Sequence, residues 1–178
     1  MPKNNLDQKV VDQNIDRLQT FLVESGIDAA YISSYDAYLN EYVPLTDCPR
    51  YYVTNFTGSV AEVIVPAQGK VQLFVDGRYF EQAAQEINPQ KVEVVECTQQ
   101  KSVFEQLLDR LQAEDRNKLI LSADRTTYGD YQQLSKLISL AHFKEGSLES
   151  LIGLSHQVIA KEIEKVSDHW KLPTVSEK

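Results

Sequence analysis

The residues best suited to chemistry lie in two short segments. The first, residues 36–50, combines acidic, aromatic and basic side chains, and the second is Asp76-Gly77-Arg78-Tyr79. An arginine at the end of a strand, as we expect Arg78 to be, can bind a carboxylate through two parallel hydrogen bonds. The candidates for such contacts are Asp36, Glu41, Tyr42, Arg50, Asp76 and Arg78.

Both segments also have a purely structural interpretation, which the residues alone favour. Residues 36–50 can form a solvated loop held by one surface Asp–Arg or Glu–Arg ion pair, which adds up to about 1 kcal/mol to stability. In the second segment, Asp76 can cap the following helix, Gly77 can adopt an unusual backbone angle, and Arg78 can pair with a nearby carboxylate.

The sequence contains no recognisable catalytic constellation. The histidines His142, His156 and His169 lie outside any His-Glu-x-x-His arrangement and lack a carboxylate at helical ligand spacing. Gly58-Ser59 precedes a segment with a strand pattern, so no helix N-terminus follows to form an oxyanion hole. The seven glycines supply no phosphate-binding motif. We therefore expect neither a metal site nor a catalytic site within this chain.

Composition restricts the partners and the compartment. The formal net charge of −8 over 178 residues disfavours contact with nucleic-acid phosphates. No apolar run approaches the roughly 20 residues of a membrane helix, and the first residues do not resemble a secretory signal. We expect a cytoplasmic protein without nucleic-acid or membrane partners, in which Cys48 and Cys97 are reduced thiols.

Hydrophobic periodicity predicts the elements that carry these segments. The strands are predicted over residues 27–32, 50–56, 60–65, 70–76, 92–95 and 119–121. A first helix is predicted around Val11, Ile15, Leu18 and Leu22, with an end near Gly26, and a second one around residues 79–87. A third helix is predicted after the capping box of Ser102 and Glu105. A fourth is predicted after the cap of Thr127 and Asp130, and its apolar residues are Tyr131, Leu134, Ile138 and Ala141. The turn at residues 66–69 joins two of the strands into a β-hairpin. This order indicates an α/β fold, a mixed six-stranded sheet with helices on both faces.

The chain is expected to form one domain over residues 1–153. In residues 154–178 apolar side chains recur at spacings of 4, 3 and 4, namely Ile159, Ile163, Val166 and Trp170. These residues form either a terminal helix with a linker or the beginning of the next domain.

Four motifs, in order and with matching gaps, resemble those of the N-terminal domain of aminopeptidase P. They stand here as Asp36…Glu41-Tyr42, Asp47-Cys48-Pro49-Arg50, Phe56-Thr57-Gly58-Ser59 and Asp76-Gly77-Arg78-Tyr79-Phe80. With the preceding helix and strand, the resemblance covers roughly residues 8–153. The chain departs from the family pattern at Val60-Ala61-Glu62, where a further small residue is usual.

The resemblance implies the creatinase/aminopeptidase P N-terminal fold, which is ribonuclease H-like, and a domain without catalytic residues of its own. In that family a following metallopeptidase domain binds two divalent ions, typically manganese. It releases the first residue from peptides with proline in second position. The N-terminal domain would then help to shape the cleft and a homodimer, with its own catalytic domain and peptide substrates as partners.

Two alternatives to an aminopeptidase P parent stay open. One is a protein-interaction module of a catalytically inactive relative, such as the histone-chaperone components with this fold. The other is a dipeptidase-type or creatinase-type parent. A downstream set of two Asp, one His and two Glu ligands would separate an active enzyme from an inactive relative.

Overall fold

One six-stranded sheet organises the molecule. The computed structural model describes residues 6–40, 42–97 and 100–154, and its strands lie in the order β4-β3-β2-β1-β5-β6. The strands are β1 (Ala29–Ile32), β2 (Glu62–Pro66), β3 (Val71–Asp76), β4 (Val92–Cys97), β5 (Lys118–Leu121) and β6 (Ser139–His142). Strand β2 runs antiparallel to β1 and β3, and every other neighbouring pair is parallel. The predicted mixed sheet is therefore confirmed.

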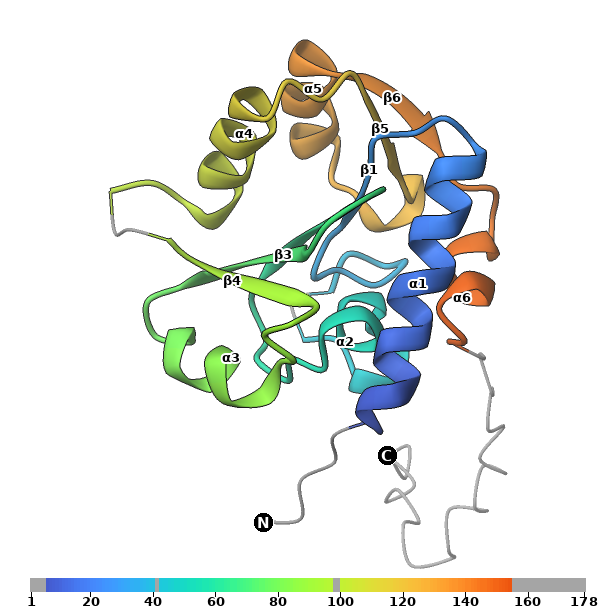
Figure 1. Cartoon of the computed structure of the whole chain (residues 1–178). Helices are drawn as coiled ribbons and strands as arrows, with labels where there is room; N and C mark the ends of the chain where they lie inside the picture. The colour runs from blue at the N-terminus through green and yellow to red at the C-terminus, as the bar shows by residue number, and fades with distance from the viewer. Residues whose placement is uncertain (1–5, 41, 98–99, 155–178) are drawn as a thin grey trace, which may run out of the picture.

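Helices cover both faces of this sheet (Figure 1). They are α1 (Gln8–Glu24), α2 (Pro49–Thr54), α3 (Phe80–Glu86), α4 (Val103–Ala113), α5 (Tyr128–Leu137) and α6 (Ser147–Leu151). Side chains alternate along each strand, so Ala30 and Ile32 of β1 pack with α1 while Ala29 and Tyr31 face α4 and α5. The two hydrophobic clusters thus form separate layers.

Helix α1 forms as its apolar spacing predicts. Its four predicted apolar residues are fully buried: Val11, Ile15, Leu18 and Leu22. The side chain of Asp7 accepts a hydrogen bond from the N–H of Lys9 and caps the first turn. Gly26 follows with φ of 62°, the left-handed conformation expected just past a helix.

The β-hairpin and the helix caps are also confirmed. Strands β2 and β3 pair antiparallel across the turn that follows Pro66. At α4, Ser102 accepts from the N–H of Glu105, and Glu105 accepts from the N–H of Ser102, which is the predicted capping box. The Thr127 side chain accepts from the N–H of Asp130 at α5.

The prediction of a strand over residues 50–56 was wrong, since helix α2 lies there. Pro49 occupies the first turn, where a missing N–H is harmless and its fixed φ suits a helix. Asn55 ends the helix with φ of 64°. The β-branched and aromatic residues are accommodated because Tyr51 and Val53 are buried, Val53 in the same hydrophobic cluster as the apolar side chains of α1. Tertiary packing here overrides local strand preference.

Strand β6 was missed as the sixth strand, and Ala141 belongs to it rather than to α5. The helix ends at Leu137, and Ile138 already has an extended backbone. Residues 139–142 pair in parallel with β5. The count of six strands therefore holds with a different membership. Within the ranges described above, no helix combines the length and apolarity needed to cross a bilayer.

Candidate functional site

The two segments singled out in the sequence emerge at the same edge of the sheet. Strands β1 and β3 are both antiparallel to β2, so they run in the same direction. Residues 36–50 lie in the connection after β1 and the beginning of α2, and the turn after β3 carries Arg78. The carboxyl edge of such a sheet is where α/β proteins commonly bind ligands. Residues of these two segments line two of the cavities at this edge.

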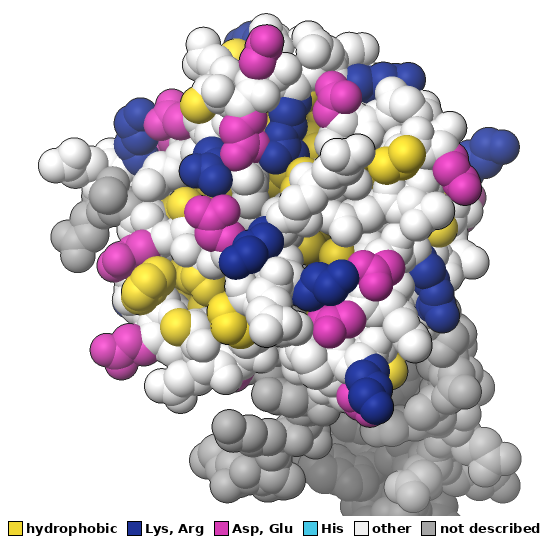
Figure 2. Space-filling model, in the orientation of Figure 1, with side chains coloured by type: hydrophobic (Ala, Val, Ile, Leu, Met, Phe, Trp, Pro, Cys, Tyr) yellow, Lys and Arg dark blue, Asp and Glu magenta, His cyan; other side chains and the backbone are white. Residues whose placement is uncertain are grey.

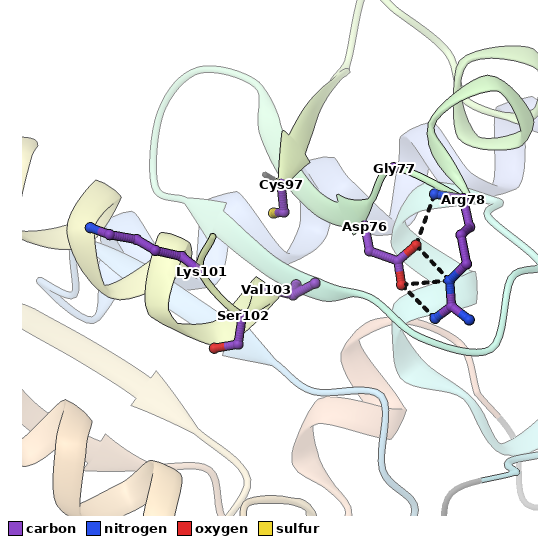
Figure 3. A pocket seen from close by; sticks show the side chains of 7 residues that line it. All are labelled: Asp76, Gly77, Arg78, Cys97, Lys101, Ser102 and Val103. Atoms are coloured by element: carbon purple, nitrogen blue, oxygen red, sulfur yellow. Dashed lines mark hydrogen bonds and ion pairs between the residues drawn. The ribbon is translucent and has the colours of Figure 1, made fainter. Parts of the chain in front are cut away.

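The first cavity, the Asp76 pocket, has a volume of about 660 Å³. Figure 3 shows its lining residues, which are Asp76, Gly77, Arg78, Cys97, Lys101, Ser102 and Val103. The Arg78 side chain is 78% exposed, and its Nη2 lies 2.7 Å from Asp76 Oδ2. Hydrogen bonding to the Arg78 side chain is the main reason that the pKa of Asp76 is lowered. Burial raises the pKa of the Cys97 thiol to about 11, so it is protonated and a poor nucleophile at neutral pH.

The structural interpretation of this turn is correct in one part and wrong in two. Arg78 does pair with a nearby carboxylate, that of Asp76. Asp76, however, bonds to the backbone N–H and side chain of Arg78 and does not cap α3, whose first residues have no side-chain cap. The φ angle of Gly77 is also not positive, so this glycine does not adopt the left-handed conformation. The Asp76 carboxylate is satisfied within the turn, so it has no need of the helix end.

The second cavity, the Arg50 pocket, has a volume of about 380 Å³. Its lining residues are Ser34, Tyr42, Val43, Pro44, Leu45, Arg50, Thr57, Gly58 and Ser59. Tyr42 is 77% exposed, whereas Arg50 is only 2% exposed. The structure therefore brings Tyr42 and Arg50 together, and it places Arg78 and Asp76 in the other cavity.

The sequence suggested a surface ion pair for Arg50, but Arg50 forms none with the residues that the structure describes. Its Nη1 donates to the carbonyl of Phe56 at 3.3 Å and its Nη2 to the carbonyl of Gly58 at 2.6 Å. The guanidinium also lies 5.1 Å from the centre of the Phe56 ring. That expectation was wrong because α2 carries Arg50 inward.

Asp36 shapes the loop rather than facing the solvent. It is buried, and it accepts hydrogen bonds from the N–H groups of Tyr38 and Asn40, both at 2.9 Å, and from the side chain of Asn40. Burial would raise its pKa, but these hydrogen bonds outweigh burial and lower the pKa. Glu41 lies outside the described residues.

Arg125, which joins three distant segments, was not predicted from the sequence. Its Nη2 donates to Asp47 at 2.8 Å, and its Nε donates to Glu149 at 3.1 Å. Its Nη1 also donates to the carbonyls of Tyr35 and Asp47. Arg125 thus holds the loop after β1 against the segment after β5 and against α6. Its only sequence signal was a charge in a short, otherwise polar connection.

A second missed feature is the pair formed by Tyr31 and Glu62 between β1 and β2. The Tyr31 hydroxyl donates to Glu62 at 2.9 Å. Burial raises the pKa of Glu62 to about 8, although the bond from Tyr31 opposes this shift. The signal in the sequence was the acidic residue inside the apolar run 60–65, at the departure from the family pattern.

The histidines and acidic groups do not assemble into a metal site in the described part of the chain. No group of three or more His, Cys, Asp and Glu side chains there fits a metal ion. His142 stacks on Tyr131 with ring centres 5.7 Å apart. His156 and His169 lie outside the described ranges. On the face seen in Figure 2, basic and acidic side chains are interspersed, as on an ordinary solvated surface.

Comparison of this chain with known proteins identifies similar protein families and relatives. Residues 14–151 match the model of the creatinase/prolidase N-terminal domain. Xaa-Pro aminopeptidase 1 of Dictyostelium discoideum is 30% identical over 84 residues, which are 47% of this chain and 13% of that protein. Aminopeptidase P2 of Arabidopsis thaliana is 37% identical over 81 residues, or 44% and 11% of the two chains.

A solved structure shares the fold. The X-prolyl aminopeptidase of Caenorhabditis elegans, a cytosolic enzyme with a di-nuclear active site, aligns with a TM-score of 0.64 and 19% identity. The alignment covers 79% of this chain and 25% of that one. The chain thus spans a small part of these relatives. Because the family model covers well over half of the sequence, the chain belongs to the creatinase/prolidase N-terminal domain family.

Proposed function

We propose that this chain is the N-terminal, non-catalytic domain of a metal-dependent Xaa-Pro aminopeptidase. The observation that carries the proposal is the similarity to two curated Xaa-Pro aminopeptidases, at 30% and 37% identity. The geometry supports it, since the candidate contact residues lie around two cavities at one edge of the sheet. That arrangement suits contact with another part of a larger protein or with its substrate.

The parent enzyme would remove the first residue from peptides whose second residue is proline. Two divalent ions, manganese in the family pattern, would be held by a later domain, because the described residues of this chain do not fit a metal pair. The C. elegans neighbour is cytosolic and has a di-nuclear active site, which supports two ions and a cytoplasmic enzyme. We further propose a homodimer, with residues 1–153 as the domain and 154–178 as the connection to the next.

The exposed members of the candidate set would make the contacts. Tyr42 and Arg78 present most of their side chains at the carboxyl edge and would touch the catalytic domain or a bound peptide. Asp36 and Asp76 would position them, because Asp36 fixes the turn before Tyr42 and Asp76 orients the Arg78 guanidinium. Arg50 would contribute from the wall of its pocket, and Glu41 stays a candidate from the sequence.

The test compares this chain with the full-length parent. Both are assayed with a Xaa-Pro tripeptide in the presence of manganese, and manganese binding is measured by calorimetry. We expect turnover by the parent alone and no tight manganese binding by the 178-residue chain. Manganese-dependent turnover by the isolated chain would overturn the proposal, as would a parent whose remaining sequence lacks clustered acidic metal ligands.

A further inference from the structure

The Arg50 pocket contains a buried cation that has no ion-pair partner among the described residues. Among the residues that the structure describes, no carboxylate forms an ion pair with Arg50. A guanidinium has five N–H groups, and here two of them donate, both to neutral backbone carbonyls. The Nε is buried and has no hydrogen-bond partner in this part of the chain. Burying a charge in this way costs free energy unless an acidic group pairs with it.

Glu62 is an acidic group close enough to attract Arg50, but it does not neutralise it. Attraction to Arg50 is the smallest of the influences on the pKa of Glu62, and burial, the largest, raises that pKa to about 8. Glu62 is therefore mostly protonated at pH 7, and its hydrogen bond is made with Tyr31.

Comparison with Arg125 shows how the same fold treats a buried arginine elsewhere. Arg125 is 4% exposed and is bound by two carboxylates, those of Asp47 and Glu149. The cations of the Asp76 pocket are also paired, Arg78 with Asp76 and Lys101 with Asp109. Arg50 differs from these cations because it is buried at the wall of a cavity and has no carboxylate partner among the described residues.

The other walls of the pocket indicate the shape of the ligand. Ser34 exchanges hydrogen bonds with the backbone of Ala61, and Ser59 is 2.8 Å from the Tyr79 hydroxyl, so both serines are already engaged. Val43-Pro44-Leu45 adds an apolar wall. The volume of about 380 Å³ admits a small group, and the guanidinium is the strongest available donor.

We propose that the Arg50 pocket binds a carboxylate carried on a short apolar chain. Two sources have this chemistry: the carboxylate of a peptide, and an acidic side chain of the rest of the parent protein. The binding itself is a property of this chain. The inference rests on the function proposed above only for the source of the carboxylate.

The experiment titrates the ¹⁵N-labelled 178-residue chain with 3-methylbutanoate and follows the Nε–Hε resonance of Arg50 by NMR. The neutral 3-methylbutanamide is the matched probe. We expect a saturable shift with a dissociation constant in the millimolar range for the acid, and at least a tenfold weaker response to the amide. No saturable shift, or an equal response to both probes, would overturn the proposal.

Variants separate binding in the pocket from general attraction to a cationic surface. Val43 lines the cavity and is only half-buried, so Val43→Trp should fill the cavity, and the folded chain should then bind the acid at least tenfold more weakly. Lys101→Ala removes an exposed cation from the other cavity and should leave the titration unchanged. Arg50→Lys keeps the charge but loses the planar fork, and its binding should also weaken if the variant folds. Undiminished binding by the folded Val43→Trp chain would place the carboxylate elsewhere and refute the assignment.

The full-length parent distinguishes the two sources. If an acidic side chain of the parent occupies the pocket, the acid should bind the isolated chain but not the parent. If the ligand is a peptide carboxylate, both should bind. Neither outcome depends on peptidase activity, so a failed activity assay and a failed titration identify different errors.

Discussion

Arg125 shows how much one buried side chain can depend on partners far away in the sequence. Replacing it with methionine keeps most of its volume but leaves Glu149 buried and Asp47 partly buried without their cation. We expect the Arg125→Met chain to lose about 3 kcal/mol of unfolding free energy, measured by urea denaturation. The loop after β1 should also exchange its amide hydrogens faster.

Lys91→Met provides the control for this prediction. Lys91 pairs with Asp16 at 2.6 Å, but both side chains are well exposed. Its loss should therefore change the unfolding free energy by less than about 1 kcal/mol. Equal effects of the two substitutions would contradict a structural role for the Arg125 cluster.

Glu62 makes stability depend on pH in a direction unusual for a carboxylate. Its pKa is raised from 4.5 to about 8 in the folded chain, so between these values the folded state holds a proton that the unfolded state has released. Stability from this group is complete below pH 4.5 and is lost as pH rises toward 8. Glu62→Gln should remove that fall in stability, which is on the order of 2 kcal/mol. This figure is smaller than the full pKa difference would give, because part of the Glu62 side chain is accessible to solvent.

The measurement compares urea unfolding of the wild type and Glu62→Gln from about pH 5 to about pH 8, the window between the two pKa values. The two curves should separate progressively as pH rises, with the variant the more stable at the alkaline end. A constant difference across this range would mean that Glu62 does not titrate there.

At the scale of the element, the turn that follows α2 depends on the lack of a side chain at Gly58. A Cβ atom built at this position would lie 2.2 Å from the Phe56 ring, which is fully buried and stacked under Arg50. Gly58→Ala should therefore displace the ring and destabilise the chain by about 1–3 kcal/mol. Gly129→Ala is the matched control.

Gly129 lies in the first turn of α5, where a Cβ would meet only the Thr127 hydroxyl at 3.8 Å. Alanine there should be neutral or stabilising by up to about 1 kcal/mol, since glycine is unfavourable in a helix. Thermal unfolding of both variants tests the pair. Similar stabilities of the two variants would mean that the Phe56 ring can move aside without a loss of unfolding free energy.

At the scale of the whole molecule, Arg78 tests whether the carboxyl edge serves interdomain contact or substrate. Since its guanidinium is exposed in this chain, Arg78→Ala should leave the isolated chain as stable as before. In the full-length parent we expect a lower melting temperature with unchanged kinetics per folded molecule. A changed KM with unchanged melting would show substrate contact instead, and Lys101→Ala controls for loss of a neighbouring exposed charge.

Local patterns in the sequence were sufficient for much of the architecture. Helix α1, the hairpin of β2 and β3, and the caps at Ser102 and Thr127 depend on residues within a few positions of one another, so periodicity and capping chemistry predict them. The motif order likewise indicated the family that the comparison then showed.

Tertiary structure alone decided which charges are buried and what they contact. Residues 50–56 have a strand pattern, but packing against α1 makes residues 49–54 helical. As a result Arg50, which was expected at the surface, is buried and lines a cavity. Arg125 meets Asp47 across 78 positions, and Glu62 meets Tyr31 across 31. The free energy of a buried charge depends on the distance and shielding of such partners, which no short stretch of sequence encodes.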